Sequence, residues 1–301
     1  METQEHERLF GGPNGYGHKH DPLGRKHAPI ERLFAARRVD TSAALPDHDE
    51  LSPFVACVLD QGSGEEGTSS CEGHRMVGAI AVVLNRRALR RGLGMVDVDP
   101  VNPPAELFNP IDPYTGGRAI ERAREYPSGD LPALIDEGAI TADVFEAGRR
   151  HGFRAARGCS NFPASPASVN KEISLDLLES ESTHKMVGGF DAGQGGARIE
   201  QARRAITQLG VPVAVDTDVD PAFELWTPDQ APIGAPDPAK SLGGHAIFAA
   251  DYRFDPRSGT FEWLIVNSWT TGWGLSGCGW CSEAWFRAAR AVRVMDLKEA
   301  A

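Results

Sequence analysis

The feature that most restricts the fold is the order of apolar patterns along the chain, helical in the first half and strand-like in the second. From Cys71 to about Leu89 apolar residues recur at helical spacing, and helix-like patterns also span residues 117–125, 131–151 and 197–209. Four later segments have the composition of strands, namely VPVAVDTDV, GHAIFAADYRF, FEWLIVNSW and ARAVRVMDL. Because helices and strands do not alternate, the order predicts an α+β fold with segregated halves.

The first 46 residues differ in composition from the rest of the chain. They are rich in Gly, Pro, His and charged residues, and only IERLFAARRV has a short helical pattern. We therefore expect an extended N-terminal arm over residues 1–46 and a globular domain over residues 47–301. The arm histidines His18, His20 and His27 have no acidic or thiolate frame around them in the sequence, so we predict solvated side chains and no metal site.

Composition excludes several functional classes. With 301 residues, 41% of them hydrophobic, the chain can form one large core or two modest ones. It has no apolar run of about 18 residues and no signal peptide, so we expect neither a membrane span nor secretion. A net charge of −11 repels phosphate backbones and argues against nucleic-acid binding. The five cysteines form an odd, low count that fits a reducing compartment such as the cytoplasm.

Cys71 and Gln61 have the residue types needed for thiol chemistry. Cys71 lies where its helix should begin, and the partial positive charge of a helix N-terminus favours a thiolate. Taken alone, such a cysteine is more often a small buried hydrophobic residue. Gln61 lies upstream, and its side-chain amide beside the backbone N–H of the nucleophile can form a two-donor oxyanion hole.

Three residues in the second half complete this pattern. His245 opens an apolar strand after two glycines, which allow another backbone or a substrate to approach closely. Another apolar strand ends at Asn267 and is followed by Trp269. An asparagine can accept a hydrogen bond from one imidazole nitrogen and direct the other toward a thiol, while an indole shields that bond from water. A lone histidine is more often a core residue, but together these residues predict nucleophilic catalysis.

The blocks DQG…SSC, GGHAIFAADY and VNSWTTGWG resemble the three signature blocks of the papain-like C1 family of cysteine peptidases, in the family's order Gln, Cys, His, Asn. A weaker likeness to the bacterial and phage-type branch extends from about Tyr16 to Leu297. The resemblance implies a two-lobed fold with a helical lobe over about 60–195, an antiparallel, barrel-like β lobe over about 196–298, and a cleft between the lobes. It also implies a peptide or protein substrate, no cofactor, and a cytoplasmic or virion-associated protein whose arm could join a larger assembly.

The same resemblance implies a role for each site residue. Cys71 is the nucleophile that forms an acyl-enzyme, and His245 shuttles the proton. Asn267 orients the imidazole, with Trp269 in support. The Gln61 amide and the Cys71 N–H are the oxyanion donors.

Two departures from the family pattern leave other functions open. The segment GEEGT lengthens the link from Gln61 to Cys71, and Glu72 replaces the Trp of better-known members. A carboxylate beside the thiol should raise the thiol pKa and oppose its activation. The alternatives are a weak or inactive papain-like domain that serves as a structural or binding module, possibly in a phage particle, and a transamidase that uses the same acyl-enzyme.

The remaining candidate residues have simpler interpretations. Cys278 and Cys281 match C-x-x-C, but on a strand they point to opposite faces, so we expect structural thiols. Cys57 and Cys159 are expected to be buried or half-buried, and a bridge between them stays open. We expect His74 on the helix surface, and the acidic run DTDVD at 216–220 at a solvated strand end.

Overall fold

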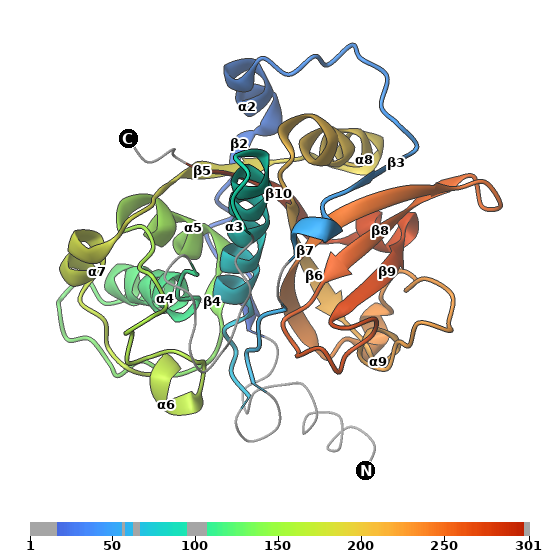
Figure 1. Cartoon of the computed structure of the whole chain (residues 1–301). Coiled ribbons are helices and arrows are strands. Elements are labelled where there is room, and N and C mark those ends of the chain that lie inside the picture. The colour runs from blue at the N-terminus through green and yellow to red at the C-terminus, as the bar shows by residue number, and fades with distance from the viewer. Residues whose placement is uncertain (1–16, 56–57, 63–66, 95–106, 298–301) are drawn as a thin grey trace.

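A long helix, α3 (Cys71–Arg90), lies at the centre of the molecule, with helices on one side and a sheet on the other (Figure 1). The structure, a computed structural model, describes residues 17–55, 58–62, 67–94 and 107–297. The helical side contains α4 (Ile111–Glu125), α5 (Thr141–Arg150), α6 (Pro166–Val169) and α7 (Leu175–Glu181). Within the described residues, no helix is both long and apolar enough to cross a bilayer.

The other side is an eight-stranded sheet whose strands follow the order β2-β5-β10-β6-β7-β8-β9, with β3 paired to β7. The strand pairs are antiparallel except for β2 with β5. The strands are β2 (Ala28–Pro29), β3 (His48–Glu50), β5 (Met186–Asp191), β6 (Val213–Val219), β7 (Gly243–Asp255), β8 (Thr260–Val266), β9 (Cys278–Ser282) and β10 (Ala291–Leu297).

Short elements connect or cover these two layers. A separate two-stranded sheet pairs β1 (His18–Lys19) with β4 (Ala139–Ile140). Near the edge of the large sheet lie α2 (Ile30–Arg37) and α8 (Gly195–Arg204) (Figure 1). The rest are α9 (Pro221–Glu224), α10 (Glu283–Ala288), a π turn (Ala205–Leu209) and two 3-10 turns (Ser52–Phe54 and Pro238–Lys240).

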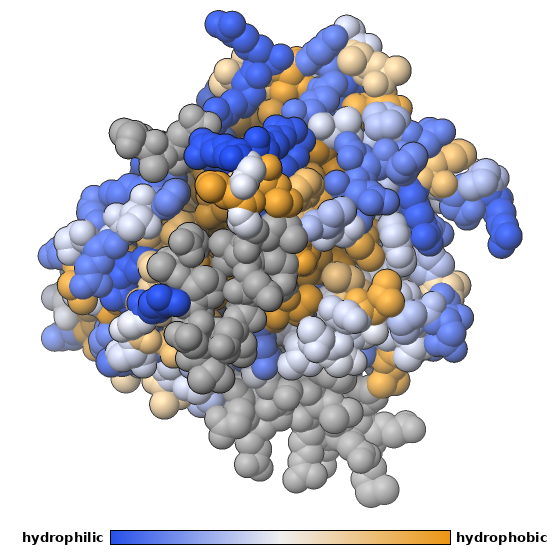
Figure 2. Space-filling view, in the orientation of Figure 1, coloured by the Kyte–Doolittle hydropathy of each residue, from blue (hydrophilic) through white to orange (hydrophobic). Residues whose placement is uncertain are grey.

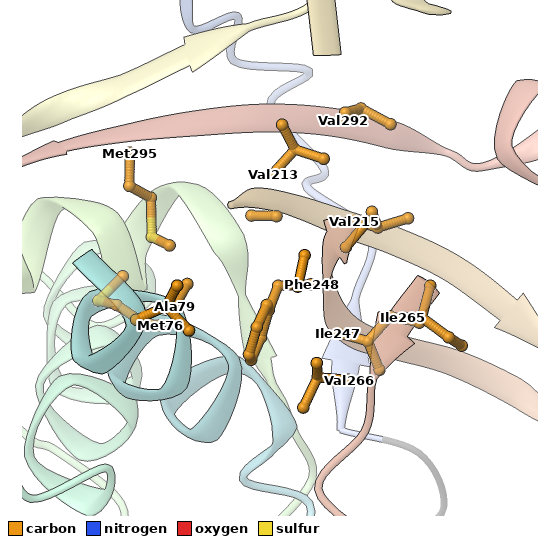
Figure 3. Packing of buried hydrophobic residues seen from close by; sticks show 14 of the residues in the cluster. Met76, Ala79, Val213, Val215, Ile247, Phe248, Ile265, Val266, Val292 and Met295 are labelled. Atoms are coloured by element: carbon orange, nitrogen blue, oxygen red, sulfur yellow. The ribbon is translucent and has the colours of Figure 1, made fainter. Parts of the chain in front are cut away.

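The main hydrophobic core lies between α3 and the sheet (Figure 3). Met76 and Ala79 on α3 face Phe248 on β7 and the valines of β6. The helix approaches the strand closely at Gly78, where a Cβ would lie 2.8 Å from a ring carbon of Phe248. Hydrophilic side chains cover the left and right flanks of the face in Figure 2. The packing of α3 on β7 places the N-terminus of α3 beside the start of β7.

Most predicted elements are present, and the α+β class is confirmed. The helix from Cys71 and the four predicted strands all form. The helix expected over 131–151 is wrong in its first half, because α5 begins only at Thr141. Gly138 has a φ of +89°, which ends any helix there, and residues 139–140 form β4 instead. The arm and lobe boundaries stay predictions, although β5 belongs to the sheet before residue 196.

Candidate active site

Cys71 is the first residue of α3 and is completely buried. Its thiol lies against β7, where the backbone of Ala246 hydrogen-bonds to it. Burial raises the pKa of the Cys71 thiol well above its usual range, and the neighbouring Glu72 carboxylate raises it further. The Ala246 bond and the Arg75 charge act in the opposite direction but are smaller. Burial in this arrangement therefore disfavours the thiolate.

His245 lies near the start of β7, one residue before Ala246, and is also completely buried. Its Nε2 hydrogen-bonds to Asn267 Oδ1 at 2.8 Å, directly after the end of β8. The Trp269 indole stacks on the imidazole with the ring centroids 4.7 Å apart. Burial lowers the pKa of His245 to about 4, although the Asn267 bond raises it. Because Asn267 engages Nε2, Nδ1 is the ring nitrogen that can serve a thiol.

Gln61 is buried between the two halves of the molecule. Its backbone N–H donates to the Ser268 carbonyl at 3.0 Å, and its Oε1 accepts from the Ser268 hydroxyl at 2.6 Å. Its Nε2 donates to the Thr68 carbonyl at 2.8 Å, three residues before Cys71. The lengthened link does not prevent the amide from being fixed near the helix start. Residues 63–66 of that link lie outside the described residues, and the oxyanion role of Gln61 stays a prediction.

Residues Gly17–Lys19, which we call the strap, run between the two halves beside Cys71 and His245. On one side the strap pairs in parallel with β4, and the Ala139 N–H donates to the Gly17 carbonyl at 2.8 Å. On the other side Gly17 forms a bridge with Gly244, the residue before His245. A Cβ at Gly17 would lie 1.5 Å from the Ser69 carbonyl oxygen. The strap therefore lies across the start of α3 and the start of β7, next to Cys71 and His245.

His18 of the strap joins an ionic cluster at the start of α3, whose other members are Glu72, Arg75, Asp216 and Arg293. His18 Nδ1 hydrogen-bonds to Glu72 Oε1 at 2.7 Å. Arg75 pairs with both Glu72 and Asp216, and Arg293 pairs with Asp216. Burial disfavours the Asp216 carboxylate, but the two arginines hold its pKa below its usual range. Glu72 therefore shares its charge with Arg75 and does not face the thiol alone.

Three expectations about solvated residues are wrong. The His18 side chain is only 7% exposed because the strap presses it onto Glu72, and His27 is half-buried against Phe145, whereas His20 is exposed as expected. His74 is buried because α3 is packed on all sides at that level. The run at 216–220 is not a solvated strand end, as its central strand position buries Asp216, Thr217, Val219 and Asp220.

The cluster also has the composition of a metal site. One ligand atom from each of His18, Glu72 and Asp216 lies within 4.8 Å of the others. However, the carboxylates already bond to Arg75, Arg293 and the Thr141 hydroxyl, so a cation would have to displace two arginines. We interpret these residues as an ionic cluster.

The cysteines other than Cys71 lie apart from the candidate catalytic residues in the sequence. Cys278 and Cys281 are free thiols on β9, and Cys281 is buried while Cys278 is half-buried, as strand alternation predicts. Cys159 is a free thiol that donates to the Ala155 carbonyl at 3.1 Å. Cys57 lies outside the described residues, but because Cys159 is a free thiol, the bridge between them that the sequence left open is not formed.

Sequence reasoning missed the residues that surround Glu72. Arg75 follows Glu72 at the i+3 spacing of a helical ion pair, just before the apolar run from Met76 to Leu84, and this spacing was a usable signal. Asp216 interrupts an apolar strand, which signals a buried partner. No local pattern pairs His18 with Glu72, because these residues are 54 positions apart.

A helical half and an antiparallel sheet that meet at the N-terminus of the central helix define the papain-like cysteine protease fold, and this chain has that fold. Among solved structures, xylellain, a cysteine protease from Xylella fastidiosa, matches with a TM-score of 0.61 and 20% identity, over 96% of this chain and 97% of that one. Digestive procathepsin L2 from Tenebrio molitor larval midgut matches at 0.64 and 18%, over 97% and 80%. Procathepsin B S9 from Trypanosoma congolense matches at 0.60 and 12%, over 98% and 89%. No protein-family model and no curated protein matches the sequence.

Proposed function

We propose that this chain is a cysteine-type peptidase that hydrolyses peptide bonds through Cys71, His245 and Asn267. One observation carries the proposal: the His245 imidazole is fixed by Asn267 and stacked on Trp269, on the strand whose next residue contacts the Cys71 thiol. This arrangement supports the proposed roles of Cys71 as nucleophile, His245 as base and Asn267 as the group that orients the base.

In the proposed reaction the Cys71 sulfur attacks the scissile carbonyl carbon after His245 has accepted the thiol proton. The Cys71 N–H and the Gln61 amide donate to the oxyanion of the tetrahedral intermediate. His245 then gives the proton to the leaving amine, and an acyl-enzyme remains. Water, deprotonated by His245, attacks the thioester and releases the acid, which returns Cys71 to its starting state.

We propose that the strap covers the site and sets its resting state, so that a substrate reaches Cys71 only when the strap moves. Burial disfavours both the thiolate of Cys71 and the imidazolium of His245, which favours a neutral pair in the covered state. When the strap moves away, water reaches both groups and this burial effect weakens. We therefore expect the reactive ion pair to form only in the open state.

The test is selective labelling of the thiols with iodoacetamide at neutral pH, followed by mapping of the adducts by mass spectrometry. Wild-type protein is compared with Gly17→Val, which opens the strap, and with Cys71→Ala. We expect Cys71 in the Gly17→Val protein to react at least tenfold faster than Cys159 or Cys278, since a thiolate is the reacting form.

His245→Ala in the Gly17→Val background should remove this advantage, and Asn267→Ala should reduce it. Cleavage of a mixed peptide library by the same proteins, read by mass spectrometry, reports turnover directly. Equal labelling of all thiols together with no cleavage would identify the chain as a non-catalytic module.

A further inference from the structure

Of the two strap side chains, Lys19 pairs with Glu121 on α4, and His18 is the one that lies beside the candidate catalytic residues. The strap's main-chain contacts, with Ala139 on one side and Gly244 on the other, are made by Gly17, where a Cβ would overlap the Ser69 carbonyl, so they require glycine there but do not select the next side chain. Its side-chain contact is specific, because the imidazole of His18 is 7% exposed and bonds to a carboxylate that is fully buried. Selectivity at this position therefore depends on the side chain.

The site that receives His18 is built by the domain. Glu72 comes from α3, Thr141 from the start of α5, and Asp216 from β6. The Thr141 hydroxyl donates to Glu72 Oε1 at 2.7 Å, the same oxygen that His18 Nδ1 contacts. A cavity of about 490 Å³ adjoins this point and is lined by residues that include His18, Ile140, Thr141, Asp216, Arg290 and Arg293. The cavity provides room for a ligand to enter when the strap leaves.

The charges of the site favour an imidazole over other side chains. Without His18, the carboxylates of Glu72 and Asp216 are balanced by the guanidinium groups of Arg75 and Arg293. A lysine or arginine side chain would bring a permanent charge into a buried site that has no net countercharge, and it would lose its hydration. An aliphatic side chain would deprive Glu72 of a donor. A neutral imidazole can donate an N–H to Glu72 without adding charge.

We propose that this site is a specificity pocket for a histidine side chain of the substrate, which binds where His18 lies in the covered state. The inference rests on the proposed peptidase function, because it treats the bound peptide as a substrate. The binding itself does not require catalysis. The pocket would select peptides with histidine at one position near the scissile bond and would disfavour leucine, lysine and arginine there.

The first test uses the full chain with Cys71→Ala, so that binding is measured without turnover. His18→Ala is added to vacate the pocket, and imidazole is the probe, with thiophene as a five-membered ring that has no N–H. Imidazole should raise the melting temperature of the His18→Ala protein in a saturable way, and thiophene should not. The protein that retains His18 should show neither effect, because its pocket is full.

The second test keeps His18 and serves if His18→Ala fails to fold. Acetyl-Gly-His-Lys amide and acetyl-Gly-Leu-Lys amide compete with iodoacetamide for Cys71 in the Gly17→Val protein. We expect the histidine peptide to protect Cys71 from labelling at a concentration roughly tenfold lower than the leucine peptide. This ratio corresponds to one hydrogen bond to a buried charged group. Glu72→Gln should reduce this ratio.

Equal protection by the two peptides, or equal effects of imidazole on the filled and vacated pockets, overturns the specificity proposal. Slow labelling of Cys71 in every variant would instead count against the peptidase, and the melting experiment would still decide whether the pocket binds imidazole. The two failures are therefore distinguishable.

Discussion

Arg75 is the residue whose loss should weaken the molecule most clearly. It is fully buried and neutralises two carboxylates that belong to different halves, Glu72 on α3 and Asp216 on β6. In Arg75→Met the side chain keeps a similar length and loses the charge, so both carboxylates remain buried with only Arg293 to balance them. Breaking a buried ion pair in this way costs about 3–5 kcal/mol of unfolding free energy.

For a chain of this length, that loss corresponds to a decrease in melting temperature of roughly 5–8 °C, from the usual entropy of unfolding per residue. The assay is urea and thermal unfolding followed by circular dichroism. Arg149→Met is the matched control, because Arg149 pairs with Glu146 at the surface and is 48% exposed, so its loss should cost about 0–1 kcal/mol. Glu72→Gln added to Arg75→Met should recover part of the stability. If Arg75→Met loses no more than Arg149→Met, the cluster is not the stabilising unit described above.

Two further predictions concern the strap and acid stability. Gly17→Val should speed iodoacetamide labelling of Cys71 roughly tenfold or more relative to wild type, because the new Cβ would overlap the Ser69 carbonyl. Gly188→Ala is the control, because a Cβ there meets nothing within 4 Å. Equal labelling rates in the two variants would contradict the covering role of the strap. His245 and His27 have pKa values lowered to about 4 by burial, so between pH 6.5 and 4 the unfolded chain binds protons that the folded protein excludes. Unfolding free energy should therefore fall by up to ~1.4 kcal/mol per pH unit for each histidine as the pH is lowered through that window. Urea titrations at pH 7.0, 5.5 and 4.5 measure it, and unchanged or higher stability at pH 4.5 would refute it.

The large elements of the fold were predictable because their apolar periodicity is strong. The helix from Cys71 and the strands that became β6, β7, β8 and β10 each have a buried face that the sequence displays directly. The helix predicted over residues 131–138 does not form. The residue pattern there is compatible with a helix, but the positive φ at Gly138 is not. The two-residue strands β1, β2 and β4 have no periodicity at all, and they form through pairing with distant partners.

The candidate site was predictable only where its residues have recognisable neighbours in the sequence. His245 and Asn267 lie in distinctive blocks, and the structure joins them by a hydrogen bond. The surroundings of Glu72 were not predictable in the same way. Sequence alone places the Glu72 carboxylate beside the thiol, whereas packing also buries it and surrounds it with Arg75 and His18. Burial of charge is a tertiary property, because it depends on which distant residues arrive as partners.

The covalent connection of the strap has a kinetic consequence. Since Lys19 is joined to β2 at Ala28 by a short segment, the strap competes for the site at an effective concentration in the millimolar range or above. Under the proposed function, a free peptide would reach Cys71 only in the fraction of molecules that are open, so its apparent affinity would be reduced by that fraction. At low substrate concentration the observed rate would then depend on the opening equilibrium. A second molecule that captured the released strap would raise the rate without touching the catalytic groups.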